Sequence, residues 1–228
     1  NNCTDVDTVS VIVNYPPVAS VTPAGSAFRC QGDDTLNYSI SPIAETDTYS
    51  WMISPSGAGN IASSAENATV NWNFSFTGAA GISVVVENEC GIDTSGVLVV
   101  QTNPIPFPDL GNDTTICSGN SLFLDAGPAD SYYWSDGFDQ QIHEISISGI
   151  LMVETTLGMC SNSDTILVNV SNPVIEFGQD SIISANPFTL DAGAGFSEYY
   201  WSDGSSAQTL LVSGTGWYSV TVTNAFGC

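Results

Sequence analysis

Phe123-Leu124-Asp125-Ala126-Gly127, followed by Tyr132-Tyr133-Trp134-Ser135-Asp136-Gly137, recurs almost unchanged further along the chain. The second copy reads Thr189-Leu190-Asp191-Ala192-Gly193 and then Tyr199-Tyr200-Trp201-Ser202-Asp203-Gly204, so that the two tryptophans lie 67 residues apart. A period of this length without helical signals indicates small β-domains in series, because solenoid repeats are shorter. A spacer, stalk or adhesive fibre needs the same small module repeatedly, whereas an enzyme seldom does.

The chain is strongly acidic. Its 228 residues include 24 Asp and Glu but a single arginine (Arg29), no lysine and one histidine (His143). The net charge of −23 excludes binding to a nucleic-acid backbone as a main activity, because nothing neutralises the phosphates. It also argues against anionic membrane surfaces, and no apolar run is long enough to predict a membrane-spanning helix. The acidic residues fit a solvated surface that keeps neighbouring chains apart, or alternatively sites for cations such as calcium.

Proline-rich segments mark the expected module boundaries, and such junctions are semi-rigid. The segments are Pro16-Pro17, the stretch Pro104–Pro108, and Pro173. The predicted parts are 1–17 (the last strand of an upstream module and a linker), 18–102, 103–172 and 173–228 (C-terminally incomplete). The last three are called the first, second and third module below. Residues 5–13 resemble residues 163–170, so we expect the chain to be a piece of a longer protein.

Short runs of β-branched and aromatic residues, separated by turn residues, predict β-sandwiches without helices. In the first module the predicted strands are Thr35–Ile40, Thr48–Ser54, Ala68–Phe74, Ile82–Glu87 and Val97–Gln101. In the second they are Ser121–Leu124, Ser131–Trp134, Glu144–Ile147, Ile150–Glu154 and Thr165–Val170. In the third they are Phe188–Leu190, Glu198–Trp201, Thr209–Val212 and Trp217–Val222.

The six cysteines suit small β-domains of an oxidising, extracellular compartment. Cys30 with Cys90, and Cys117 with Cys160, bracket equivalent parts of successive modules and are predicted to form disulfides. Each bond would close a loop worth roughly 4 kcal/mol on the loop-entropy estimate. Cys3 is expected to have its partner upstream, and Cys228 is expected to be unpaired. Reduced thiols remain the alternative, since a sequence does not prove a disulfide.

Further phrases carry a resemblance that covers nearly the whole chain. They are residues 110–117, 216–223 and Gly227-Cys228 in the second and third modules, and Cys30-Gln31-Gly32-Asp33, Tyr49-Ser50-Trp51, Val70-Asn71-Trp72 and Asn88-Glu89-Cys90-Gly91 in the first. This pattern resembles the PKD-like and immunoglobulin-like repeats of giant secreted surface proteins of Bacteroidota, including the mobile adhesins of gliding bacteria. The resemblance implies tandem small β-sandwiches arranged end to end, exported by type IX secretion. Two departures are the third module's missing first cysteine and Ile150-Leu151-Met152 in place of Gly216-Trp217-Tyr218.

The aromatic residues allow two interpretations. Trp51, Trp134 and Trp201 are predicted to anchor the cores, because a tryptophan repeated in every sandwich is usually a packing residue. Sugar stacking is the alternative use of an aromatic side chain. Tyr133 and Tyr200 are candidates for it, since one tyrosine of each Tyr-Tyr pair must face away from the core.

Acidic residues and hydroxyls supply two further candidate sites. Asp-Gly pairs most simply make turns, but Asp113, Asp125, Asp136 and Asp139 could alternatively converge on calcium, the one cofactor that we consider. Asp followed by Ser or Thr and then an apolar residue or Thr resembles the O-glycosylation signal of Bacteroidota. The candidate acceptors are Thr8, Thr35, Thr114, Thr165 and Ser181. The alternative is that Asp-Thr simply starts strands.

The sequence contains few residues suited to catalysis. His143 stands alone, and no nucleophile elbow, phosphate loop or histidine-based metal motif occurs. We therefore expect no enzyme but a stalk or fibre segment of a very large adhesin at the cell surface, acting in attachment or gliding. Its expected partners are neighbouring modules and a surface polysaccharide. The alternative is a set of carbohydrate-binding modules on a secreted polysaccharide-degrading enzyme.

Overall fold

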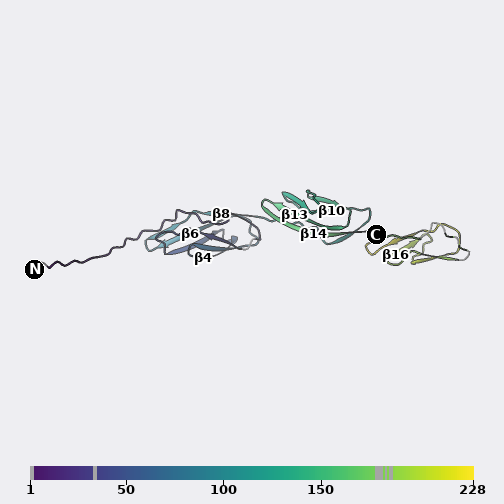
Figure 1. Ribbon diagram of the computed structural model, residues 1–228, viewed down its shortest axis with the longest axis horizontal. Helices are drawn as coiled ribbons and strands as arrows, with labels where there is room; N and C mark the ends of the chain where they lie inside the picture. The colour runs from purple at the N-terminus through teal and green to yellow at the C-terminus, as the bar shows by residue number, and fades with distance from the viewer. Residues whose placement is uncertain (1–2, 33–34, 178–181, 183, 185–186) are drawn as a thin grey trace. The chain divides into compact units, whose positions relative to one another are not determined.

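The computed structural model describes residues 3–32, 35–177, 182, 184 and 187–228. Apart from one 3-10 turn at Ser56–Ala58, the regular elements of these described residues are β-strands (Figure 1). The all-β class predicted from the alternating runs is therefore confirmed.

The first module consists of two sheets. One has the strand order β1-β8-β6-β3 with β7 pairing on β6, and the other has the order β2-β5-β4. The strands are β1 (Phe28–Cys30), β2 (Thr35–Ser39), β3 (Thr48–Ser54), β4 (Gly59–Ser64), β5 (Asn67–Trp72), β6 (Gly78–Asn88), β7 (Gly91–Thr94) and β8 (Leu98–Asn103). Strand β1 runs parallel to β8, which places Cys30 opposite Asn103 at the end of both strands.

Alternation along these strands builds the core of the first module. In β5 the side chains of Ala68, Val70 and Trp72 are buried, while the residues between them are less buried. Because side chains of a strand point to opposite faces in turn, this pattern directs one face of β5 inward. Trp51 of β3 and Val84 of β6 belong to the same buried cluster, so residues of both sheets contribute to one core.

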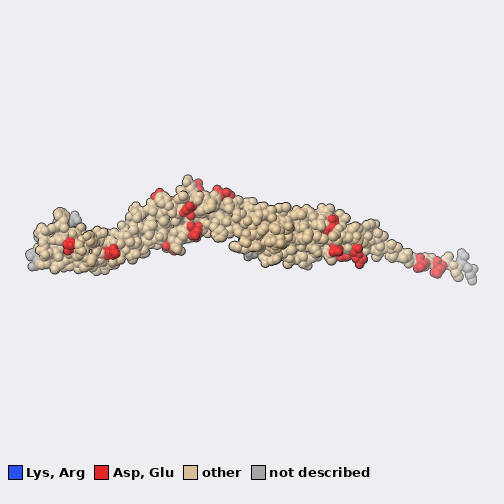
Figure 2. All heavy atoms as spheres, turned by 180° about the vertical axis from the view of Figure 1, so that it is seen from behind, with Lys and Arg blue, Asp and Glu red and all other residues tan. Residues whose placement is uncertain are grey.

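The single arginine lies inside this core. Arg29 is 2% exposed, and its guanidinium carbon lies 4.8 Å from the ring centroid of Trp72. A guanidinium over an aromatic face is attracted by the ring quadrupole. Its Nη1 also donates a hydrogen bond of 3.3 Å to Thr102 Oγ1. Since the chain has no lysine, no Lys or Arg remains to balance the acidic surface, and Figure 2 shows red acidic side chains without blue.

The second module repeats the two-sheet plan with fewer strands. One sheet has the order β11-β13-β14-β9, and the other is the pair β10-β12. The strands are β9 (Thr114–Cys117), β10 (Leu122–Asp125), β11 (Ser131–Trp134), β12 (Ile142–Ile145), β13 (Gly149–Leu157) and β14 (Cys160–Ser171). Strand β9 runs parallel to β14 and places Cys117 opposite Ser171, as β1 and β8 place Cys30 opposite Asn103.

The third module contains two two-stranded sheets in its described residues. These are β15 (Phe188–Asp191) with β17 (Thr209–Val212), and β16 (Glu198–Trp201) with β18 (Val220–Thr223). They correspond to the pairs β10-β12 and β11-β13 of the second module. In both modules the tryptophan of the Tyr-Tyr-Trp run faces a valine in the ladder, Val153 for Trp134 and Val220 for Trp201.

Residues 3–13 pair with no strand of the described residues. They have no regular secondary structure, and their side chains are exposed, Val9 to 87% and Val11 to 75%. A strand needs a neighbour for its backbone hydrogen bonds, and no strand of the described residues pairs with this segment. That residues 5–13 are the last strand of an upstream module stays a prediction.

By compactness the chain divides into two units. The first contains residues 1–105 and 157–161, and the second contains residues 106–156 and 162–228. The first unit holds the core around Trp51, and the second holds two separate cores, around Trp134 and Trp201. The tip of the β13–β14 hairpin is thus counted with the first unit, although its strands belong to the second module.

Candidate functional site

Two disulfides link the modules rather than closing loops within them. Cys30 is bonded to Cys160 and Cys117 to Cys228, with Cα–Cα distances of 5.6 and 5.3 Å. The predicted pairs Cys30–Cys90 and Cys117–Cys160 are therefore wrong, and so is the prediction that Cys228 is unpaired. Cys90 and Cys3 are free and exposed.

The parallel ladders explain why the predicted pairs do not form. Cys117 lies opposite Ser171 at one end of β14, whereas Cys160 begins the same strand. The 11 residue steps between Cys160 and Ser171 span about 36 Å, while a disulfide tolerates a Cα–Cα distance of about 7 Å at most. The two cysteines of the second module therefore lie at opposite ends of its sheet and are available only to other modules.

Each bonded hairpin also touches the residue beside its partner cysteine. Asn224 Nδ2 donates a hydrogen bond of 2.6 Å to the hydroxyl of Ser171, the ladder neighbour of Cys117. At the other junction, a Cβ on Gly158 would lie only 2.9 Å from the side-chain amide of Asn103, the ladder neighbour of Cys30. At both disulfides, the segment that carries one cysteine thus closely approaches the ladder neighbour of the other cysteine.

An aspartate of β7 and one of β14 hold the incoming linker in the first and second modules. Asp93 Oδ2 accepts a hydrogen bond of 2.7 Å from the backbone N–H of Ala19, and Asp164 Oδ2 accepts one of 2.7 Å from Leu110. The Ala19 hydrogen bond is the main reason why the pKa of Asp93 is lowered. The roles of both residues were missed in the sequence, although each is followed by threonine and Asp164-Thr165 was interpreted as a glycosylation signal.

The three tryptophans predicted as core anchors are buried. Trp51 is 7% exposed, and Trp134 and Trp201 are fully buried. Each indole Nε1 donates to a backbone carbonyl, at 2.9 Å to Ala65, 2.8 Å to Gln140 and 2.7 Å to Ala207. A buried indole N–H that has an acceptor costs little, so these side chains supply apolar area without an unsatisfied donor.

The tyrosines divide as the strand geometry requires. Tyr132 and Tyr199 pack on the cores, and their hydroxyls donate to the carbonyls of Gly127 and Gly193 at 2.9 and 2.8 Å. Tyr133 and Tyr200 point away and are 60% and 67% exposed. The exposed rings are therefore available for stacking, although their exposure does not by itself identify a ligand.

Three of the four candidate calcium ligands, Asp113, Asp125 and Asp136, are engaged in separate local contacts. Asp113 accepts from the backbone of Leu167, and Asp136 lies 2.7 Å from His143 Nε2. Among the described residues, no group of three or more acidic, histidine or cysteine side chains could hold a metal ion. Asp125 and Asp139 do not join the other two, so the calcium site predicted from Asp113, Asp125, Asp136 and Asp139 is not assembled.

Asp125 instead forms a turn contact that the third module repeats. Its Oδ1 accepts from Gln141 Nε2 at 2.8 Å and from the Gly127 N–H at 2.9 Å. Asp191 Oδ1 accepts from Gln208 Nε2 at 2.8 Å and from the N–H of Gly193. The glutamine side chain is the main cause, and the glycine N–H the second, of the lowered pKa of Asp125 and Asp191. The repeated Asp-Ala-Gly therefore fixes a turn.

His143 is a packing residue. Its ring stacks on Phe138 with centroids 4.1 Å apart and meets Trp134 edge-on at 5.1 Å. The hydrogen bond with His143 lowers the pKa of Asp136. The position equivalent to His143, which is half-buried, is the buried Leu210 in the third module, so the site requires bulk rather than an imidazole.

The glycosylation candidates differ in accessibility. Thr8, Thr35 and Thr165 are exposed, Thr114 is half-buried on β9, and Ser181 lies outside the described residues. A hydroxyl must be accessible to be modified, so Thr8, Thr35 and Thr165 fit the prediction best.

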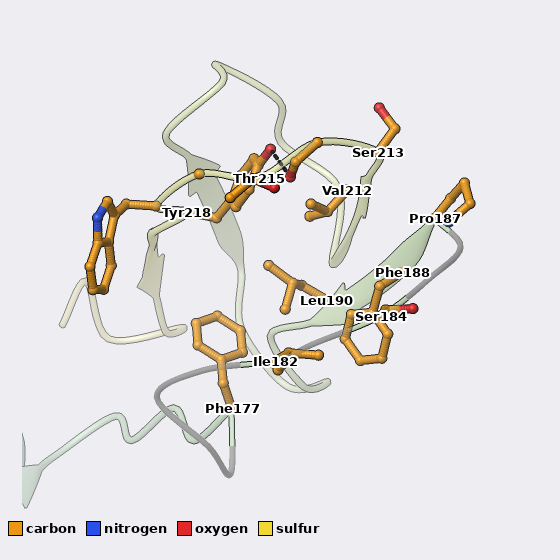
Figure 3. A pocket seen from close by; sticks show the side chains of 13 residues that line it. Phe177, Ile182, Ser184, Pro187, Phe188, Leu190, Val212, Ser213, Thr215 and Tyr218 are labelled. Carbon is orange, nitrogen blue, oxygen red and sulfur yellow. Dashed lines mark hydrogen bonds between the residues drawn. The ribbon is translucent and has the colours of Figure 1, made fainter.

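A cavity of about 420 Å³ opens in the third module, where Leu190, Val212 and Ile182 point into it (Figure 3). Leu190 and Val212 correspond to Leu124 and Ile145 of the second module, which share their core with Ile166 and Val168 of β14. The cavity therefore lies where the second module is filled by β14 side chains.

No helix of the described residues has the length and apolar character needed to cross a membrane.

Residues 16–100 match the PKD-like domain family. A three-domain immunoglobulin fragment of titin superposes with a TM-score of 0.39 at 14% identity, covering 93% of this chain and 95% of that one. The N-terminal eight immunoglobulin domains of Down Syndrome Cell Adhesion Molecule give 0.35 at 13% identity, covering 84% of this chain and 33% of that one. Similarity at this level carries no information on function, and no curated protein matches the chain.

Proposed function

We propose that this chain, whose residues 16–100 match the PKD-like domain, is a stalk segment of a very large extracellular adhesin. The observation that supports this most directly is that its two disulfides join successive modules. A bond within a module protects only that module, whereas a bond between modules keeps them together when the chain is pulled. Covalent links of this kind suit a protein that transmits force.

The two covalent loops overlap along the sequence. The loop from Cys30 to Cys160 contains Cys117, and the loop from Cys117 to Cys228 contains Cys160. The shortest covalent path from Asn1 to Cys228 therefore runs through residues 1–30, crosses to Cys160, returns to Cys117 and crosses to Cys228. Most of the first module, and all of the third except Cys228, lie outside this path and are shielded from direct extension.

The acidic surface supports the same role. Because the single arginine is buried, like charges surround the chain and oppose lateral association of neighbouring copies. Glycans on the exposed Thr8, Thr35 and Thr165 would add solubility and protect strand edges. Export by type IX secretion to the surface of a gliding bacterium, with a polysaccharide as the adhesive ligand, is the cellular setting that we propose.

Attachment under flow tests this function. Cells that display the protein with Cys30→Ser and Cys117→Ser should detach at lower shear than wild-type cells with the same amount of protein at the surface. Ser206→Ala is the control, since this exposed residue belongs to neither disulfide. Equal detachment of the double variant and wild type, with the bonds shown to be absent, would contradict a role in transmitting force.

A carbohydrate-binding role is the second candidate, favoured by the exposed Tyr133 and Tyr200 at equivalent positions of two modules. Regularly spaced exposed rings would stack on sugars along one polysaccharide. Binding on a glycan array that is lost in Tyr133→Ala or Tyr200→Ala would support this role. If the intact chain binds no glycan, the carbohydrate-binding role is contradicted and the stalk function is the remaining candidate.

A further inference from the structure

Cys90 occupies the same place in the first module as Cys160 and Cys228 occupy in the other two, after the strand that pairs with the tryptophan strand. It lies between β6 and β7, as Cys160 lies where β13 turns into β14. Asn88 Oδ1 accepts the N–H of Cys90 at 2.8 Å, and Asn224 Oδ1 accepts the N–H of Cys228 at 3.0 Å. In both cases an asparagine side chain accepts the N–H of the cysteine, which lies two residues after Asn88 and four residues after Asn224.

A second observation, independent of the thiol, shows what lies beside this turn. Asn88 Nδ2 donates a hydrogen bond of 2.7 Å to the carbonyl of Tyr15, and a Cβ on Gly91 would lie 3.2 Å from Pro16 Cβ. The Asn224 side chain makes the corresponding contact with Ser171. The Cys90 turn therefore holds residues 15 and 16 in the way that the Cys228 turn holds the end of β14.

The sequence before Tyr15 aligns with β14. Asp7-Thr8 corresponds to Asp164-Thr165, and at this offset Asn14 corresponds to Ser171. Ser171 is the ladder neighbour of Cys117, the partner of Cys228, and Asn103 is the ladder neighbour of Cys30, the partner of Cys160. In both bonded cases the hairpin contacts the residue that lies beside the partner cysteine. The Cys90 turn contacts the residue next to the corresponding position.

We infer that Cys90 forms a third disulfide of this type, with a cysteine that ends the first strand of a preceding module. That strand would run parallel to residues 5–14, as β9 does to β14. Cys3 is not the expected partner, because it aligns with Cys160. Cys160 and Cys90 occupy equivalent positions, and each such cysteine bonds to one at the end of a first strand. The inference rests on the proposed function, since it requires a preceding module of the same kind.

The chemistry is thiol–disulfide exchange. The Cys90 thiol and the partner thiol together lose two protons and two electrons, and one S–S bond forms between them. The oxidant is an external disulfide, either an oxidase or a small-molecule disulfide, whose S–S bond is cleaved to two thiols. Cys90 is exposed, so such a reagent can reach it.

Non-reducing peptide mapping of the mature protein from its native source tests the inference. Free thiols are blocked during extraction, and digestion uses a protease specific for acidic residues, since the chain has one arginine and no lysine. We expect the Cys90 peptide to be joined to a peptide that precedes Asn1. The cysteine of that peptide should follow a stretch of alternating apolar and polar residues typical of a β-strand. Blocking of Cys90 should fall at least tenfold below that in a reduced sample.

The outcomes separate this inference from the proposed function. A blocked Cys90, or Cys90 bonded to Cys3 or Cys30, would overturn the inference even if Cys30–Cys160 and Cys117–Cys228 are intact. Absence of those two bonds as well would instead contradict the disulfide-linked stalk. In a Cys90→Ser protein the cross-linked peptide to the preceding sequence should disappear while the other two remain.

Discussion

The second and third modules share their central sequence but differ in what surrounds it. Both contain the Tyr-Tyr-Trp strand, the buried tryptophan with its indole hydrogen bond, and the Asp–Gln turn contact. Among the described residues, only those of the second module form a four-stranded sheet, in which β14 adds Ile166 and Val168 to the core. The third has a small buried cluster and a cavity. The comparison shows that the repeated motif determines the local turns and strand pairs, whereas the closing strand determines the extent of the core.

Removal of the buried tryptophans tests this difference with the largest expected effect. Trp134→Ala should lower the free energy of unfolding of the second module by about 3–5 kcal/mol, because a large side chain leaves a cavity in a closed core. Trp201→Ala should cost less, since the smaller core of the third module can collapse more readily. Denaturant unfolding of each variant, with hydrogen exchange resolved by module, measures both. A larger loss of unfolding free energy for Trp201→Ala than for Trp134→Ala would contradict the claim that the third module has the smaller core.

Loss of the disulfide between these modules should have the next largest effect. Cys117→Ser with Cys228→Ser should destabilise by about 2–4 kcal/mol, the usual range for a bond that closes a long loop. The effect should be greater in the third module, whose own core is small. Hydrogen exchange of β15–β18 relative to β10–β14 reports it. Equal loss of protection in both modules would show that the third does not depend on this bond more than the second.

The smallest effect concerns the turn that both modules share. The pKa values of Asp125 and Asp191 are lowered in the folded chain, so their ionised forms are favoured there. Their contribution to stability is therefore present above the unfolded pKa of about 4 and is lost as the pH falls through the lower folded value. Asp125→Asn and Asp191→Asn should each slightly weaken the fall of the melting temperature between pH 5 and pH 2. A clear effect in one module only would show that the turns are not equivalent.

The strands were predictable from sequence where alternation was long enough. Thr48–Ser54, Ser131–Trp134, Glu198–Trp201 and Thr209–Val212 were predicted with the observed bounds. Four strands were missed, β1, β4, β7 and β9, because runs of three to six residues such as Phe28–Cys30 or Gly59–Ser64 carry little periodicity. These short strands form because neighbouring strands supply the partners for their backbone hydrogen bonds.

The disulfides could not be derived from spacing alone. Cys117 and Cys160 bracket most of the second module in the sequence, and this spacing predicts a bond between them. The parallel pairing of β9 with β14 instead places them at opposite ends of the sheet. This pairing brings together residues more than 50 positions apart and has no local signal. The burial of Arg29 is similar, since an isolated arginine in an acidic chain is expected at the surface, whereas contacts with Trp72 and Thr102 from distant parts of the sequence hold it in the core.

Single-molecule pulling from the two ends of the chain tests most directly whether the disulfides link successive modules. The covalent path through both bonds contains about 75 residues, so the oxidised chain should extend to about 270 Å and the reduced chain to about 820 Å, at about 3.6 Å per residue. Bonds within modules, Cys30–Cys90 and Cys117–Cys160, would leave about 127 residues in the path and give about 460 Å. An oxidised extension near 270 Å is the predicted result, and one near 460 Å would contradict the account.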